Sequence, residues 1–202
     1  MLTSMRRMLA GLLLAGGLAA CAAQQEAAAP AGPPQPANPQ PTATQLSPGL
    51  TPLYFIATLD HVDNMPRNAA ELAKGRRGPA ILQLDVESGS GRMWDSQAAE
   101  GFAVHMTGLI QLEAGIYRFA AFSNDGIRIT IDRTRVVDDP SVHAGQMSPV
   151  TEVRISEPAW YPITVQYFQK RGTAALKFYW QPPGAGGLML VPAAALAHLP
   201  AR

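Results

Sequence analysis

Ile127-Arg128-Ile129-Thr130-Ile131-Asp132 is the stretch that decides the fold class, because isoleucines alternate strictly with polar residues. Successive side chains of a β-strand point to opposite faces, so this alternation predicts a strand with one buried face and one wetter face. The stretch directly follows Ser123-Asn124-Asp125-Gly126, whose residue types favour turns. We therefore predict a β-strand that is entered through a turn.

The same pattern continues on both sides of this strand. Further strands are predicted at residues 53–57, 80–86, 102–112, 117–122, 134–137, 153–155, 161–167 and 174–180. One short helix is predicted at residues 69–74, with Asn68 as its N-cap, Glu71 at the capping-box position and Gly75 as its stop. Short strands at this spacing, separated by glycine-containing turns, predict an all-β antiparallel double-sheet β-sandwich or barrel.

The N-terminus resembles a bacterial lipoprotein signal. Arg6 and Arg7 precede an apolar run, 8–20, that is too short to span a bilayer and ends in Leu18-Ala19-Ala20-Cys21. The resemblance implies removal of residues 1–20 and acylation of Cys21, with palmitate among the chains. Ala22 in place of Asp favours the outer membrane of a Gram-negative bacterium, on its periplasmic or its surface face. The alternative is an ordinary signal peptide with an incidental cysteine.

Residues 21–48 are predicted to be the lipidated cysteine and a linker rich in Pro, Ala and Gln. Glu26 is the linker's single charge, and its prolines disfavour both helix and sheet. A polyproline II spacer of this length reaches roughly 80 Å, and a disordered tail fits the composition equally well. In either case we expect the linker to bury little surface, which leaves residues 49–202 as one folded domain.

Composition narrows the function classes. Lys and Arg number 16 against 15 Asp and Glu, and no basic run stands out, so a nucleic-acid partner is not expected. Cys21 is the sole cysteine, so the folded part is expected to contain no disulfide and to depend on core burial. There is no nucleophile elbow and no carboxylate pair at an identifiable catalytic spacing, so we expect a protein that is not an enzyme.

Several motifs, in order and at the right spacing, resemble the protective-antigen-type (PA-fourteen) domain. The resemblance covers roughly residues 49–199. It implies a β-barrel-like double-sheet module of the kind found in toxin protective antigens, yeast flocculins and adhesins, and bacterial glycosidases. The motifs that carry it are Gly49-Leu50, Tyr54-Phe55, and residues 102–110, 115–119, 123–132, 161–168, 175–180 and 191–196.

The resemblance also implies a site. In lectin-like members, two adjacent acidic residues joined by a cis peptide bond hold Ca²⁺ at the tip of the barrel, and the ion bridges sugar hydroxyls. By this resemblance Asn124 and Asp125 are the candidate metal ligands. Residues 169–173 form the second loop, so carbohydrate contacts are expected from Asn124, Asp125, Gln169, Lys170 and Arg171.

This sequence departs from the family pattern at the expected site. Asn124 replaces an acid, which should weaken Ca²⁺ because affinity falls with each lost carboxylate. Lys170 and Arg171 would compete with the metal ion and would favour acidic sugars.

Other interpretations of these residues stay open. Asn124-Asp125-Gly126 is also a common hairpin turn. Asp138 and Asp139 fit a solvated loop or additional oxygen ligands. Asp60 and Asp63 are expected to be loop charges, and His105 to be structural. Trp94, Trp160 and Trp180 fit either sugar stacking or core packing.

The sequence thus predicts an envelope-anchored lipoprotein with a non-catalytic glycan-binding or adhesion domain that depends on Ca²⁺. Its partners would be the membrane, through the lipid anchor, and a glycan or polysaccharide. The alternative is a structural or assembly lipoprotein whose barrel binds a protein partner without metal. A third interpretation is an accessory module that targets a separately encoded enzyme to polysaccharide.

Overall fold

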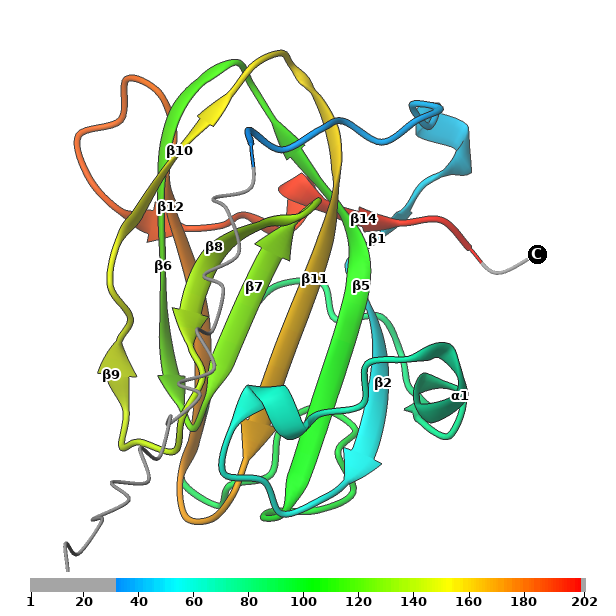
Figure 1. Ribbon diagram of the computed structural model, residues 1–202, viewed down its shortest axis with the longest axis vertical. Helices are drawn as coiled ribbons and strands as arrows, with labels where there is room; N and C mark the ends of the chain where they lie inside the picture. Colours follow the sequence, from blue (N-terminus) through cyan, green and yellow to red (C-terminus); the bar gives the residue numbers. More distant parts are fainter. Residues whose placement is uncertain (1–31, 201–202) are drawn as a thin grey trace, which may run out of the picture.

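The computed structural model describes residues 32–200, in which two antiparallel sheets pack against each other (Figure 1). The all-β double-sheet prediction is confirmed. The larger sheet has the order β1-β14-β5-β11-β7-β8, with β2 pairing β5 and β3. Its strands are β1 (Ser47–Pro48), β2 (Thr51–Ile56), β3 (Arg76–Arg77), β5 (Phe102–Leu112), β7 (Ile127–Ile131), β8 (Thr134–Asp139), β11 (Ala159–Gln169) and β14 (Leu196–His198).

The smaller sheet has the order β10-β6-β12-β13, with β4 pairing β12 and β9 pairing β6. Its strands are β4 (Asp85–Ser88), β6 (Gly115–Asn124), β9 (Gln146–Met147), β10 (Thr151–Ile155), β12 (Ala174–Gln181) and β13 (Met189–Leu190). The short helical elements of the described residues are η1 (Ala43–Gln45), η2 (Val62–Asn64), α1 (Ala69–Leu72) and η3 (Ala193–Ala195).

One hydrophobic core is built from both sheets. Ile127, Ile129 and Ile131 are fully buried in it, as their alternation predicts. Phe119 of β6 stacks on Phe178 of β12 with ring centroids 5.8 Å apart. Burial of apolar surface at about 25 cal/mol per Å² makes this core the main source of stability.

The polar face of β7 is less exposed to solvent than the alternation suggests. Arg128 is 8% exposed and pairs with Asp63 and with Asp138, each at 2.7 Å. A second small apolar cluster lies on the same side of the larger sheet, where Val62 and Met65 pack against residues of β5 and β11. The segment around η2 therefore covers this face, and it brings the Asp63 carboxylate to a strand that is distant in sequence.

Two local predictions have different outcomes. The predicted helix is observed as α1, and Asn68 Oδ1 accepts the Glu71 N–H at 3.0 Å as an N-cap should. The strand predicted at 80–86 begins only at Asp85. Ile81 instead exchanges both backbone hydrogen bonds with Leu50 as an isolated bridge, and Leu82 is 55% exposed. An apolar side chain thus lies on the surface where the alternation predicts a buried one.

Residues 32–48, expected to belong to the linker, contact the domain. We call them the N-terminal strap. Ala37 N–H donates to Trp160 O at 2.8 Å, and the Gln40 side chain both donates to Trp160 O and accepts from Trp160 N, each at 3.0 Å. The primary amide of Gln40 supplies a donor, which the backbone of the neighbouring prolines lacks, together with an acceptor, so the strap attaches without forming a long strand.

The remaining N-terminal predictions lie outside the described residues. Cys21, the signal sequence 1–20 and the first part of the linker belong to residues 1–31, so the boundaries 1–20, 21–48 and 49–202 remain predictions. Within residues 32–200, no helix is long and apolar enough to cross a membrane.

Candidate functional site

Two connections between the sheets meet at one end of the barrel. Residues 124–126 carry the chain from β6 of the smaller sheet to β7 of the larger one, so the hairpin interpretation of this turn is wrong. Residues 170–173 carry it back from β11 to β12. The registers Ile127↔Tyr167 and Asn124↔Ala175 bring the two connections together, and we call them the tip.

Asn124 and Asp125 lie where the resemblance puts them. The peptide bond between them is cis. Asp125 is 3% exposed, and its Oδ2 accepts the backbone N–H of Lys170 at 2.8 Å. Asn124 Nδ2 donates to Thr173 Oγ1 at 3.1 Å. Asn124 and Asp125 therefore each hydrogen-bond to a residue of the connection 170–173, and these bonds join the two loops.

Buried polar groups support the tip from below. Gln169 is fully buried, and its Nε2 donates to Gly172 O at 3.3 Å and to Thr173 O at 3.1 Å. Its Oε1 lies 2.9 Å from the hydroxyl of Tyr167, which also hydrogen-bonds Asn124 O. Complete burial argues that Gln169 positions the loop, rather than making the direct sugar contact expected from the sequence.

The tip offers more acceptors than donors. Burial, together with the nearby charge of Asp125, raises the pKa of Tyr167 well above its usual range, so the hydroxyl carries one proton. That proton faces two oxygen acceptors, Asn124 O and Gln169 Oε1. Asp125 is also almost buried, and residues 32–200 offer it no ion pair. A buried carboxylate is costly without a cation, so these residues fit a small cation at the tip.

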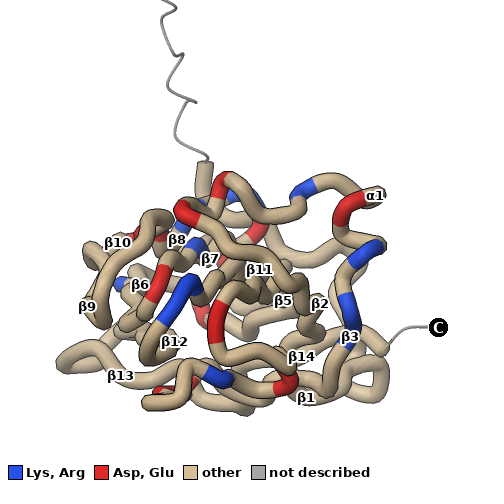
Figure 2. Tube along the Cα trace, turned by 90° about the horizontal axis from the view of Figure 1, so that it is seen from below, with Lys and Arg blue, Asp and Glu red and all other residues tan. Residues whose placement is uncertain are grey.

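Lys170 and Arg171 are arranged differently from each other. Lys170 Nζ pairs with Asp60, so its charge is already matched. Arg171 is exposed, and the described part of the chain provides it with no ion pair. Glu100 Oε1 accepts the N–H of Gly172 at 2.9 Å, which adds a second carboxylate beside the loop. Figure 2 looks onto this end and shows acidic and basic residues interspersed around it.

The second acidic pair lies close to the tip but is engaged elsewhere. Asp139 pairs in register with Ile127, at the start of β7. Asp138 binds Arg128 and Arg135, and Asp139 Oδ2 accepts from Gln146 Nε2 at 3.0 Å and lies 3.3 Å from His143 Nε2. Both carboxylates are therefore occupied by internal partners. No group of three or more His, Cys, Asp or Glu that could hold a metal ion occurs within residues 32–200.

The three tryptophans are buried to different degrees. Trp180 is 9% exposed and belongs to the core. Trp160 contacts the strap through its backbone. Trp94 is partly exposed, and its ring meets that of Tyr167 edge-on at 6.5 Å.

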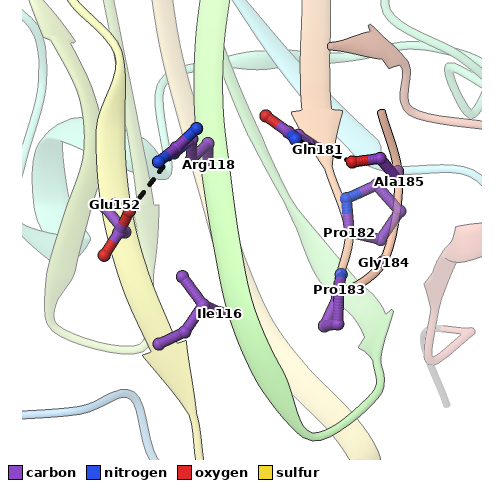
Figure 3. A pocket seen from close by; sticks show the side chains of 8 residues that line it. All are labelled: Ile116, Arg118, Glu152, Gln181, Pro182, Pro183, Gly184 and Ala185. Atoms are coloured by element: carbon purple, nitrogen blue, oxygen red, sulfur yellow. Dashed lines mark hydrogen bonds and ion pairs between the residues drawn. The ribbon is translucent and has the colours of Figure 1, made fainter. Parts of the chain in front are cut away.

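A pocket of about 380 Å³ on the outer face of the smaller sheet lies far from the tip (Figure 3). It is near the start of β6, whereas Asn124 ends that strand. The ion pair Arg118–Glu152, at 3.2 Å, occupies its polar groups, and no aromatic ring lines it. Its lining residues are Ile116, Arg118, Glu152, Gln181, Pro182, Pro183, Gly184 and Ala185.

Sequence reasoning missed three contributors to the tip. Asp60 and Glu100 come from distant loops, and no local pattern marks either of them. The alternation within residues 161–167 predicts a core position for Tyr167, but it does not predict the polar role of its hydroxyl. A buried tyrosine near a predicted loop is a usable signal, because its hydroxyl must find a partner.

Comparisons with known proteins agree with the observed fold. No curated protein matches the chain. The chain resembles a solved anti-sigma factor domain-containing protein from Clostridium clariflavum, with 18% identity, a TM-score of 0.62, and coverage of 77% of this chain and 49% of that one. This chain thus spans about half the length of that structure.

Two further solved structures are single domains of similar size. One is the Epithelial Adhesin 9 A domain from Candida glabrata in complex with Galb1-3GlcNAc, with 13% identity, a TM-score of 0.64, and coverage of 83% of this chain and 96% of that one. The other is a PA14 sugar-binding domain from an RTX adhesin, with 18% identity, a TM-score of 0.56, and coverage of 75% and 99%. At these identities the likeness shows a shared fold.

The sequence profile of the PA14 domain matches residues 83–189, which is more than half of the chain and includes both connections of the tip. This chain therefore belongs to the PA14 domain family.

Proposed function

We propose that this protein is a non-catalytic glycan-binding or adhesion domain and that the tip is its binding site. The observation that carries the proposal is Asp125, an almost buried carboxylate held between two loops and without a cation partner in residues 32–200. The sugar-binding and adhesin domains that share the fold support the same function. Such a site can recognise hydroxyl groups without any catalytic group.

Asp125 and Asn124 are the residues that would hold Ca²⁺ in this proposal. Ca²⁺ takes carboxylate and amide oxygens, and it supplies open positions for a pair of sugar hydroxyls when bound. Asp125 provides the single full charge, so affinity should be lower than with two carboxylates. Arg171, which is exposed and has no ion pair in the described part of the chain, would favour an acidic sugar.

Calorimetric titration with CaCl₂ tests the site. We expect weak uptake by the wild type and about tenfold tighter binding by Asn124→Asp, because the substitution restores a carboxylate while Thr173 Oγ1 can still hydrogen-bond it. Asp125→Ala should abolish uptake. A glycan array read with and without CaCl₂ should lose its signal in the same variant.

Other results would contradict the proposal. If the wild type takes up no Ca²⁺ and Asp125→Ala leaves the array signal unchanged, the tip is only a connection between sheets. An array without any signal, together with capture of a protein partner, would favour the structural or assembly lipoprotein.

We further propose that Cys21 is the lipid anchor that attaches the domain to the outer membrane. It lies outside the described residues, and the signal-like sequence before it supports the proposal. Each buried methylene of an acyl chain contributes about 0.8 kcal/mol, so Cys21→Ala should move the protein from the membrane fraction to the soluble fraction. Immunoblots of washed membranes measure this. Unchanged sedimentation of the variant would exclude lipidation at Cys21.

A further inference from the structure

A second pocket on the side of the barrel has the features of a small-molecule site. Its volume is about 400 Å³, within the range of ligand pockets. It shares no residue with the tip connections 124–126 and 170–173. We call it the side pocket; its lining is Tyr54, Leu82, Gln83, Trp94, Asp95 and residues 79–81.

The aromatic residues of the side pocket are held rigidly. Tyr54 is 3% exposed, and the Arg76 guanidinium lies 5.0 Å from its ring centroid. Gly78 also packs closely against the ring, because a Cβ at this position would come within 2.6 Å of Tyr54 Cε2. Trp94 packs against the core and meets Tyr167 edge-on, at an interplanar angle of 85°. Little reorganisation is therefore needed before a ligand can bind.

The side pocket also has an apolar wall that faces solvent. Leu82 is 55% exposed, although the alternation of its neighbours predicts a buried side chain. It directly follows Ile81, which bridges to Leu50, and it lines the same pocket as Trp94. An indole and an exposed leucine together form an apolar surface that a ligand can cover.

Oriented acceptors complete the side pocket. Gln83 Nε2 donates to Val191 O at 3.0 Å, which orients the amide and leaves Oε1 and the second N–H for a ligand. Asp95 Oδ2 binds Arg76 at 2.7 Å, so the carboxylate is neutralised but keeps acceptor capacity. The pocket thus offers hydrogen-bond acceptors without a net charge.

We propose that the side pocket binds one uncharged pyranose ring, as a saccharide subsite separate from the tip. A pyranose has an apolar C–H face, which would cover Trp94 and Leu82, and hydroxyl donors, which would reach Asp95 and Gln83. Balanced charge from Arg76 and Asp95 favours a neutral sugar over an acidic one. Because a monosaccharide has about 12 heavy atoms, its Kd should be on the order of 1 mM.

The test is ¹⁹F NMR of the full chain labelled with 5-fluorotryptophan, which gives one signal for each of the three tryptophans. The probes are the methyl β-glycosides of glucose, galactose and N-acetylglucosamine, with glucuronate as the acidic comparison. Trp94→Phe assigns the Trp94 signal. We expect at least one neutral glycoside to shift that signal saturably, and glucuronate to bind at least fivefold more weakly.

Leu82→Ser and Leu199→Ser form a matched pair, because the two leucines are 55% and 57% exposed and only Leu82 lines the side pocket. Leu82→Ser should weaken binding at least fivefold, whereas Leu199→Ser should not change it. Asp125→Ala and chelation of calcium should also leave it unchanged, so failure of the tip and failure of the side pocket are distinguishable. Absence of a saturable shift, or its loss in Asp125→Ala, would overturn the proposal.

Discussion

Gly126→Ala is expected to lower the free energy of unfolding by about 3 kcal/mol and to displace the tip, because no space exists for a methyl group at this position. A Cβ at residue 126 would come within 2.7 Å of Pro140 O and would also overlap the ring of Phe168. The backbone carbonyl is held by Val62 N–H at 2.8 Å, and Phe168 is fully buried. Neither Pro140 nor Phe168 can move to make room for the methyl group without a further loss of stability.

Urea denaturation of Gly126→Ala and Gly89→Ala measures this effect. Gly89 is the matched control, because a Cβ there meets nothing within 4 Å and its φ is not in the left-handed region. We expect Gly89→Ala to have the same urea midpoint of unfolding as the wild type. Gly126→Ala should have a clearly lower midpoint and should lose Ca²⁺ uptake. Equal midpoints for the two variants would mean that the turn before β7 is loosely packed.

The sequence predicts the core of this fold well because burial repeats with a simple period. Ile127, Ile129 and Ile131 alternate along one strand, and their burial follows directly. Helix α1 is equally local, since its N-cap lies three residues from its partner. The order of strands in each sheet is not local. Asn124-Asp125-Gly126 has the composition of a hairpin turn, and only the pairing partners of β6 and β7 show that it joins two sheets.

The candidate site is predictable to the same extent. The resemblance points to Asn124, Asp125 and the loop after β11, and the structure brings these residues together. The resemblance could not show that Gln169 faces inward or that Asp60 pairs with Lys170. Such pairings depend on which loops fold over the same end of the barrel, and residues 60 and 170 are too far apart for any periodic pattern to connect them.

Removing the N-terminal strap should destabilise the domain by about 2 kcal/mol, contrary to the expectation for a linker. A chain that starts at Gly49 loses the hydrogen bonds of Ala37 and Gln40 to Trp160, and that of Thr134 Oγ1 to Gly32 O at 2.9 Å. It also loses the pairing of β1 with β14. Each net hydrogen bond contributes about 1 kcal/mol, and the ordering of the strap offsets part of the sum.

Thermal and urea unfolding of chains that start at Gly32 and at Gly49 measure this difference. Gln40→Ala in the longer chain should reproduce about half of the loss, because it removes both side-chain bonds to Trp160. Thr44→Ala is the control, since its exposed side chain bonds only Thr42 within the same strap. Identical curves for the two chains would show that the strap adds nothing to stability.

Truncation of the strap should nevertheless leave the tip unchanged, because the two lie at opposite ends of the same strand. Trp160, which holds the strap, is at the start of β11, and Gln169, which supports the tip, ends it. Nine residues of strand separate them by about 30 Å. The strap therefore attaches at the end of the barrel opposite the tip. Equal Ca²⁺ uptake by the Gly32 and Gly49 chains is the expected result, and weaker uptake by the shorter chain would contradict this separation.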